Sequence, residues 1–235
     1  MDRGAHQVEV LTLLFALKVA YPERIWLLRG NHETEAMNEV YGFKKACERF
    51  SHSQLYDEAQ KVFPWLPMAA LIEQPGTKPA LVLHGGIGSG DWQIDDLRRV
   101  RRPLLEPTGL ALQVLWSDPS DSDSHMACGV HPNPERGEDV VRFGRDVTAR
   151  FCSQNGIGVV IRSHQVVPDG YKVMHGGRLL TVFSARNYTG SNTNDAALLL
   201  LATDSNGDLR VRFKQLRHHD TVHHRGHWVT LGLGH

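Results

Sequence analysis

The chain has 235 residues, of which 41% are apolar, so it is long enough to bury a core as one large domain or two small ones. Its 26 Lys and Arg residues balance 26 Asp and Glu residues, which argues against a nucleic-acid or membrane partner. Three cysteines without CxxC spacing and no apolar leader segment predict an intracellular protein of the cytoplasm or nucleus.

The first part of the chain predicts helices that alternate with short strands. Apolar residues at helical spacing predict helices over 6–20, 34–50 and 54–63. The first helix is expected to bury an apolar face that includes Leu14 and Val19. The second is expected to bury Ala36, Val40, Phe43 and Cys47. Short apolar runs predict strands at 25–28, 69–71 and 80–83.

The second part predicts a surface segment and then a series of strands. Residues 117–138 are rich in Pro, Asp and Ser and are expected to lie on the surface. A helix is predicted over 139–152, with an inward face of Val140, Val147 and Phe151. Apolar runs then predict strands at 158–161, 171–174 and 179–183, and a hairpin that joins 196–203 to 209–213 through Asn206-Gly207.

Three of the predicted strands lead into a histidine. The 25–28 run precedes Asn31, His32 and Glu33, and the other two runs precede His84 and His164. Ligands bind at the carboxyl ends of strands in sheets with helical crossovers. A single histidine in this position is more often structural, but three with the same layout favour a shared site. Two neutral imidazoles and an Asn oxygen suit Mn, Fe or Zn.

A basic run precedes Pro103 and contains Arg98, Arg99, Arg101 and Arg102. It has two interpretations. It is either the solvated end of a helix or a contact for acidic peptide substrates in a groove.

Five motifs in order carry a resemblance to a known family. They are Asp-Arg-Gly (2–4), Arg-Gly-Asn-His-Glu (29–33), His-Gly-Gly (84–86), Trp-Ser-Asp-Pro (116–119) and Ser-Ala-Arg-Asn-Tyr (184–188). Together they resemble the metallophosphoesterase core of Ser/Thr protein phosphatases, from Met1 to about Leu216. The loop after His84 also resembles phosphatases of plants and algae that carry Kelch repeats.

The resemblance implies a mixed α/β fold, a metallophosphoesterase-type αββα layered sandwich without its amino-terminal strands. The catalytic domain is expected to cover residues 1–216. Residues 217–235 form a His-rich tail that is expected to be disordered.

The resemblance also implies the site residues and two metal ions, Mn, Fe or Zn. The residues that match ligands of one metal are Asn31, His84 and His164. His32 matches the general acid that protonates the leaving oxygen, and Asp2 matches the carboxylate that orients its imidazole. Side chains that match phosphate-binding residues are Arg3, Arg136 and Tyr188. Asp118 is expected to form hydrogen bonds near the ligands.

Other ligands of the family do not occur in the sequence. Its Gly-Asp-x-His-Gly motif, which supplies an Asp and a His to the first metal, is absent, as is the Asp that bridges both metals. The chain is therefore expected to be an amino-terminally truncated catalytic domain that retains one metal site in part and has impaired activity.

The implied function is metal-dependent hydrolysis of phosphoserine and phosphothreonine in phosphoprotein substrates, with regulatory subunits as further partners. The alternative is a catalytically inactive remnant that binds phosphopeptides or partner proteins. Single residues also have alternatives. Asp2 and Arg3 could form a terminal ion pair, Tyr188 could be an ordinary core residue, and Arg162 is expected to be a structural partner of another loop. Arg186 stands where the family has proline.

Overall fold

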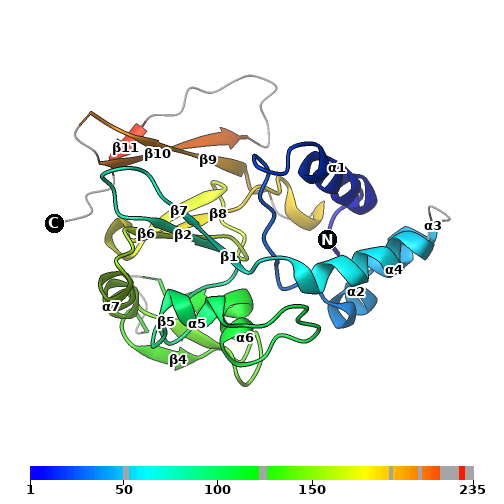
Figure 1. The fold of residues 1–235 in the computed structure, drawn as a ribbon, viewed down its shortest axis with the longest axis horizontal. Coiled ribbons are helices and arrows are strands. Elements are labelled where there is room, and N and C mark those ends of the chain that lie inside the picture. The colour runs from blue at the N-terminus through cyan, green and yellow to red at the C-terminus, as the bar shows by residue number, and fades with distance from the viewer. Residues whose placement is uncertain (50–52, 122–125, 191–192, 206–207, 218–227, 231–235) are drawn as a thin grey trace.

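The computed structural model describes the chain except residues 50–52, 122–125, 191–192, 206–207, 218–227 and 231–235 (Figure 1). The helices are α1 (Gln7–Ala20), α2 (Glu35–Tyr41), α3 (Phe43–Arg49), α4 (Ser53–Val62), α5 (Ile94–Arg98), α6 (Gly109–Trp116) and α7 (Arg145–Asn155), with 3-10 turns η1 (Phe63–Trp65), η2 (His175–Gly177) and η3 (Tyr188–Gly190). The strands are β1 (Ala69–Ile72), β2 (Ala80–Leu83), β3 (Asp118–Pro119), β4 (Val130–Pro132), β5 (Val141–Phe143), β6 (Val159–Arg162), β7 (Tyr171–Met174), β8 (Leu179–Val182), β9 (Ala196–Thr203), β10 (Leu209–Leu216) and β11 (Trp228–Thr230).

A five-stranded mixed sheet forms the centre of the fold, in the order β1-β2-β6-β8-β7. Strands β2, β6 and β8 are parallel, and β1 and β7 pair antiparallel at the two edges. All residues of β6 are buried, which explains why most of this strand is a continuous apolar run in the sequence. Because β2 and β6 are parallel neighbours, the residues that follow them meet at one edge of the sheet.

Alternate residues of the central strands face two hydrophobic layers. On one face, Leu81, Val160 and Leu179 pack with residues of α6 and α7. On the other face, Ile161 and Leu180 pack against strand β10 of the β11-β10-β9 sheet. Figure 1 shows these layers, with the β9–β11 sheet above the central sheet and α5, α6 and α7 below it. The structure confirms the predicted layered α/β fold.

Helices α1, α3 and α4 form a separate helical group with its own apolar cluster, on the right in Figure 1. Helix α1 contributes Val8 and Leu11 to this cluster. Leu14 and Val19 were expected to be buried with them, but both are exposed. The helix was predicted correctly, whereas the width of its buried face was not.

The strand predicted at 25–28 is wrong. These residues belong to none of the sheets among the described residues, and Trp26 has an exposed fraction of 70%. Within the segment, the backbone nitrogen of Ile25 donates to the carbonyl of Tyr21 at 3.0 Å, and just after it Arg29 donates to the carbonyl of Pro67 at 2.8 Å. An apolar run forms a strand only where a neighbouring strand pairs with it, and the described residues supply no such neighbour.

The helix predicted over 34–50 is interrupted. Gly42 has φ 103° and ends α2 in a left-handed conformation, so α3 does not continue the helical periodicity of α2. The buried face changes accordingly. Phe43 and Cys47 are buried as predicted, but Val40 is 74% exposed and the buried residue of α2 is Asn38. Ala36 is exposed as well.

Residues 117–138 are not a simple surface segment. Ser117, Asp118, Ser120 and Asn133 are buried, and the segment supplies β3 and β4 to a small sheet with β5. The helix predicted from 139 begins only at Arg145, after β5. The predicted inward residues Val140, Val147 and Phe151 are buried nonetheless.

The remaining strand predictions are confirmed. Strands β1, β2, β6, β7 and β8 lie where expected, and β9 pairs antiparallel with β10 as the predicted hairpin. The Asn206-Gly207 turn lies outside the described residues, as does most of the tail from 217 to 235. Within the tail, β11 pairs with β10 from Trp228 to Thr230.

No described helix combines the length and the apolar character that crossing a bilayer requires.

Candidate active site

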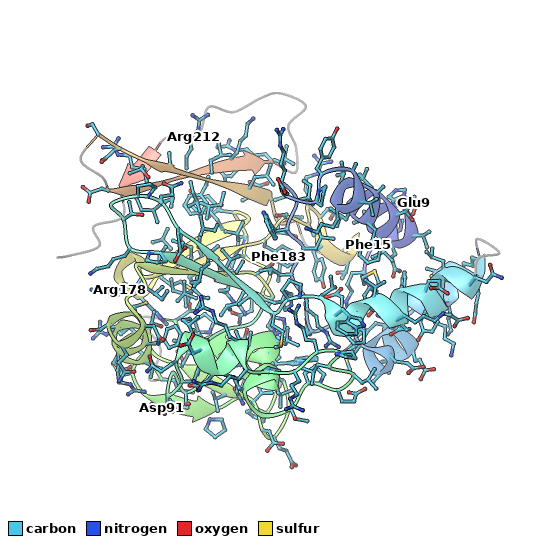
Figure 2. All side chains as sticks on the ribbon, in the orientation of Figure 1. Glu9, Phe15, Asp91, Arg178, Phe183 and Arg212 are labelled. Carbon is cyan, nitrogen blue, oxygen red and sulfur yellow. The ribbon has the colours of Figure 1, made fainter. Side chains whose placement is uncertain are left out.

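A cavity of about 630 Å³ opens where the residues after β2 and β6 meet the 29–33 turn. Its lining includes all but one of the predicted site residues, namely Arg3, Asn31, His32, His84, Arg136, His164 and Tyr188. The remaining one, Asp2, does not line the cavity but is hydrogen-bonded to His32. Phe183 also lines the cavity, and Figure 2 shows it near the middle of the molecule.

The three predicted metal ligands converge in this cavity. Oδ1 of Asn31 is 2.7 Å from Nε2 of His84, and the same nitrogen is 3.2 Å from Nδ1 of His164. Burial, followed by the charge of Arg162, lowers the pKa of His84 to about 3. Burial also lowers the pKa of His164, with the neighbouring His84 as the next cause. Both imidazoles are therefore neutral near pH 7, the state in which imidazole ligates a metal ion.

The second ring nitrogen of His164 supports this arrangement. Nε2 of His164 is buried without a hydrogen-bond partner, 3.9 Å from Oδ1 of Asp118. A neutral imidazole carries one proton, and a proton on Nε2 pointing toward Asp118 leaves the lone pair of Nδ1 facing the cavity. Nδ1 of His164, Nε2 of His84 and the Asn31 oxygen thus fit one metal ion of the Mn, Fe or Zn type.

His32 is held by a buried carboxylate. Its Nδ1 donates a hydrogen bond of 2.8 Å to Oδ2 of Asp2. Asp2 also accepts hydrogen bonds from Nδ2 of Asn38 at 2.8 Å and from the backbone nitrogen of Phe43 at 3.0 Å. The structure shows no ion pair between Asp2 and Arg3, so the terminal-pair alternative is not what the described residues form.

Two residues at the site were missed from the sequence. Asn38 binds Asp2 and donates a second hydrogen bond of 2.8 Å to the carbonyl of His32. Tyr41 lies between two predicted site residues, with the Arg3 guanidinium 4.4 Å from its ring centroid and the His32 ring 5.1 Å away. The sequence pattern could not indicate either residue, because the break at Gly42 determines which side of α2 faces the site.

Asp118 joins Arg136, which lines the cavity, to the buried Arg162. Nη2 of Arg162 donates to Oδ1 of Asp118 at 2.8 Å, and Nε of Arg136 donates to Oδ2 at 2.9 Å. Arg162 is fully buried and also donates to the carbonyl of Gly85 and to Gln165. Burial lowers the pKa of Arg162 to about 10, although Asp118 acts in the opposite direction. Arg162 is thus a structural partner of neighbouring loops, as predicted, and Asp118 fixes Arg136 at the cavity.

Tyr188 is half-buried at the side of the cavity. Its ring meets Phe183 edge to face, with centroids 5.0 Å apart, and its backbone nitrogen donates to Oδ1 of Asn194. Arg186, which stands where proline was expected, is exposed and donates to the carbonyl of Arg217 at 3.3 Å. The turn around Tyr188 thus brings its ring to the cavity wall with arginine at the proline position.

Comparison with known proteins agrees with this geometry. Residues 1–168 match the model of the calcineurin-like phosphoesterase family. Serine/threonine-protein phosphatase 5 of Homo sapiens is 40% identical over 217 residues, which cover 92% of this chain and 41% of that protein. Serine/threonine-protein phosphatase BSL2 of Arabidopsis thaliana is 38% identical over 210 residues, which cover 87% of this chain and 20% of that protein. The chain therefore spans less than half the length of these relatives.

A solved structure shows the same fold. It is a protein serine/threonine phosphatase from Saccharomyces cerevisiae with similarity to human phosphatase PP5, and it superposes with a TM-score of 0.79 at 29% identity. The match covers 96% of this chain and 69% of the yeast chain. The matched family model, the relatives and this superposition confirm the resemblance seen in the five motifs, and the chain belongs to the calcineurin-like phosphoesterase family.

Proposed function

We propose that this chain hydrolyses phosphoserine and phosphothreonine in phosphoprotein substrates, in a metal-dependent reaction at the cavity of the candidate site. One observation carries the proposal. A single cavity contains three convergent metal-ligand atoms, a histidine held by a buried carboxylate, and two arginines. The names of the relatives, which are serine/threonine-protein phosphatases, support the same substrate class.

The residues that would hold a metal ion are Asn31, His84 and His164. When bound, such an ion would activate a water molecule and neutralise part of the phosphate charge. The resemblance implies a second ion, for which none of the family's expected ligands occurs in this sequence.

His32 would supply the proton for the leaving group. Its Nδ1 is occupied by Asp2, so the opposite ring nitrogen, Nε2, remains to protonate the serine or threonine oxygen as the phosphate ester bond breaks. Asp2 holds the ring in one orientation and stabilises the charge that the imidazole carries before it releases the proton. Asn38 and the backbone of Phe43 fix Asp2 in turn.

Arg3 and Arg136 would bind the phosphate oxygens. Arg136 uses Nε for Asp118, which leaves its two terminal nitrogens to donate to two oxygens of one phosphate. The guanidinium carbon of Arg3 lies 4.4 Å from the centroid of the Tyr41 ring, and this cation–π contact holds the Arg3 side chain at the cavity. Tyr188 would border the same phosphate.

A second candidate function is binding of phosphopeptides without hydrolysis. It keeps the roles of Arg3, Arg136 and Tyr188 but needs no activated water. The observation that favours it is that Tyr41 and Asp118 hold Arg3 and Arg136 at the cavity, which Tyr188 also lines.

One experiment separates the two candidates. The 235-residue chain is mixed with a phosphoserine peptide, with and without Mn²⁺, and both phosphate release and peptide binding are measured. Release that needs Mn²⁺ and falls in His32→Ala supports hydrolysis. Binding without release in any metal supports the second candidate, and the absence of both refutes both. His131→Ala is a matched control, because the His131 side chain is hydrogen-bonded to the Cys128 carbonyl and does not line the cavity.

A further inference from the structure

A second cavity, of about 290 Å³, lies between β1 and the segment that begins with α5. Its apolar walls are formed by Leu71, Leu81, Ile94, Leu97 and Val100. It shares no lining residue with the candidate active site. In Figure 1, α5 lies next to β1, and residues of both pack on the same hydrophobic cluster. The cavity is therefore a groove of its own, and the proposed hydrolysis does not use it.

The groove reaches the open edge of the central sheet. Strand β1 is an edge strand that pairs only with β2 in the described part of the chain. Three consecutive residues, Ala69, Ala70 and Leu71, line the groove. The groove therefore follows β1 over these residues, and β1 is at the edge of the sheet. Backbone groups on an unpaired strand edge can accept an additional strand.

The rim of the groove is positively charged. Arg98 and Arg102 line it, and no carboxylate does. Arg98 pairs with Asp95 at 2.8 Å, but its side chain is 66% exposed, and an exposed pair of this kind contributes little and exchanges readily. Arg102 uses one nitrogen for the carbonyl of Trp65, at 2.7 Å. Both guanidinium groups can therefore donate to a carboxylate that lies along the groove.

We propose that this groove binds an extended acidic peptide segment of another protein. The segment adds a strand to the free edge of β1 and places one aliphatic side chain between Leu71 and Leu97. Carboxylates on either side of that anchor pair with Arg98 and Arg102. The charge of the rim excludes a basic segment, and the open strand edge requires backbone N–H groups on the partner. The inference stands apart from the proposed hydrolysis, since the groove and the active-site cavity are separate.

The test measures binding of a labelled peptide of alternating glutamate and valine by fluorescence anisotropy. Replacing both rim arginines (Arg98→Gln with Arg102→Gln) should weaken binding by about tenfold, or about threefold for each charge contact. Arg99→Gln is the matched control. Arg99 sits one residue away and pairs with Asp96 at 3.0 Å in the same i,i+3 geometry, but it does not line the groove. This control should bind as the parent does.

Two further measurements use the unaltered protein, so they hold even if a variant fails to fold. A peptide with N-methylated backbone should bind at least tenfold more weakly, because it cannot pair with β1, and added inorganic phosphate should leave binding unchanged. Equal binding of the N-methylated peptide overturns the proposal, as does equal loss in Arg99→Gln. Tighter binding of a lysine-valine peptide, a single-stranded oligonucleotide or anionic lipid vesicles also overturns it.

Discussion

Replacing Arg162 with Met should destabilise the fold by about 3–5 kcal/mol. Arg162 is fully buried at the end of β6, and its guanidinium donates to Asp118, to the carbonyl of Gly85 and to Gln165. Methionine is similar in length but has no donor. The substitution therefore leaves the buried carboxylate of Asp118 without its closest cation, and it leaves the Gly85 carbonyl without this donor.

The magnitude follows from what Asp118 retains. Breaking a buried ion pair costs about 3–5 kcal/mol because one charge stays buried without compensation. Asp118 keeps Arg136 at 2.9 Å and Asn133 at 3.1 Å, so the loss should lie near the lower end of that range. Even about 3 kcal/mol is a large share of the 5–15 kcal/mol that stabilises a typical protein.

Burial lowers the pKa of Arg162 despite Asp118, which shows that desolvation outweighs their attraction. The double replacement Arg162→Met with Asp118→Leu should therefore recover part of the loss.

The assay is urea unfolding followed by tryptophan fluorescence, with the slope of the transition compared between variants. Arg150→Met is the control, since Arg150 pairs with Asp91 at 2.9 Å in a solvent-exposed position and its loss should cost less than about 1 kcal/mol. The reasoning is refuted if Arg162→Met costs no more than this control. It is also refuted if the double variant is less stable than the sum of the two single variants predicts.

Four other predictions concern the site and the core. His32→Ala should reduce turnover by about 10²–10⁴-fold and leave the metal content unchanged, because His32 gives a proton and ligates nothing; an equal loss of bound metal would make it a ligand. Arg3→Ala and Arg136→Ala should weaken inhibition by inorganic phosphate, and unchanged inhibition in both would contradict their assignment. Burial lowers the pKa of His175, so the stability that this residue contributes is complete above the unfolded pKa of about 6.5 and declines below it. The urea midpoints at pH 8 and pH 5.5 should therefore differ less in His175→Asn than in the parent protein. An equal difference in both proteins would contradict this prediction. The sequence lacks a Gly-Asp-x-His-Gly motif, so with Mn²⁺ the chain should hydrolyse a phosphoserine peptide more slowly than about 1–10 per second, and a faster rate with two metals per chain would contradict the expected impairment.

The sequence predicts the central sheet because burial leaves a strong local pattern. Strand β6 is buried on both faces, so its first three residues form a continuous apolar run, and His164 follows the strand after Ser163. Strand β2 and His84 have the same layout. Since both strands are parallel neighbours, their histidines had to meet, and their nitrogens lie 3.2 Å apart.

The features that the sequence does not predict depend on distant partners. The 25–28 run has the apolar composition of a strand but no strand beside it among the described residues. Asp118 lies in a polar segment that is typical of a surface loop, yet it is buried because Arg162 and Arg136, 44 and 18 residues away, neutralise it. Local patterns do not report such pairings, so buried polar residues were taken for surface residues.

The proposed general acid and the two proposed phosphate-binding arginines share one structural property. Each is held by a contact with a second residue, His32 by Asp2, Arg136 by Asp118 and Arg3 by Tyr41. At two places the backbone itself is strained, since Asp2 has φ 62° and His164 has φ 64°. Left-handed conformations cost about 1–3 kcal/mol at residues other than glycine and persist only where surrounding contacts fix them. The contacts that hold these side chains exist before any phosphate or metal binds, so little of the ligand's binding energy would be lost to ordering the site.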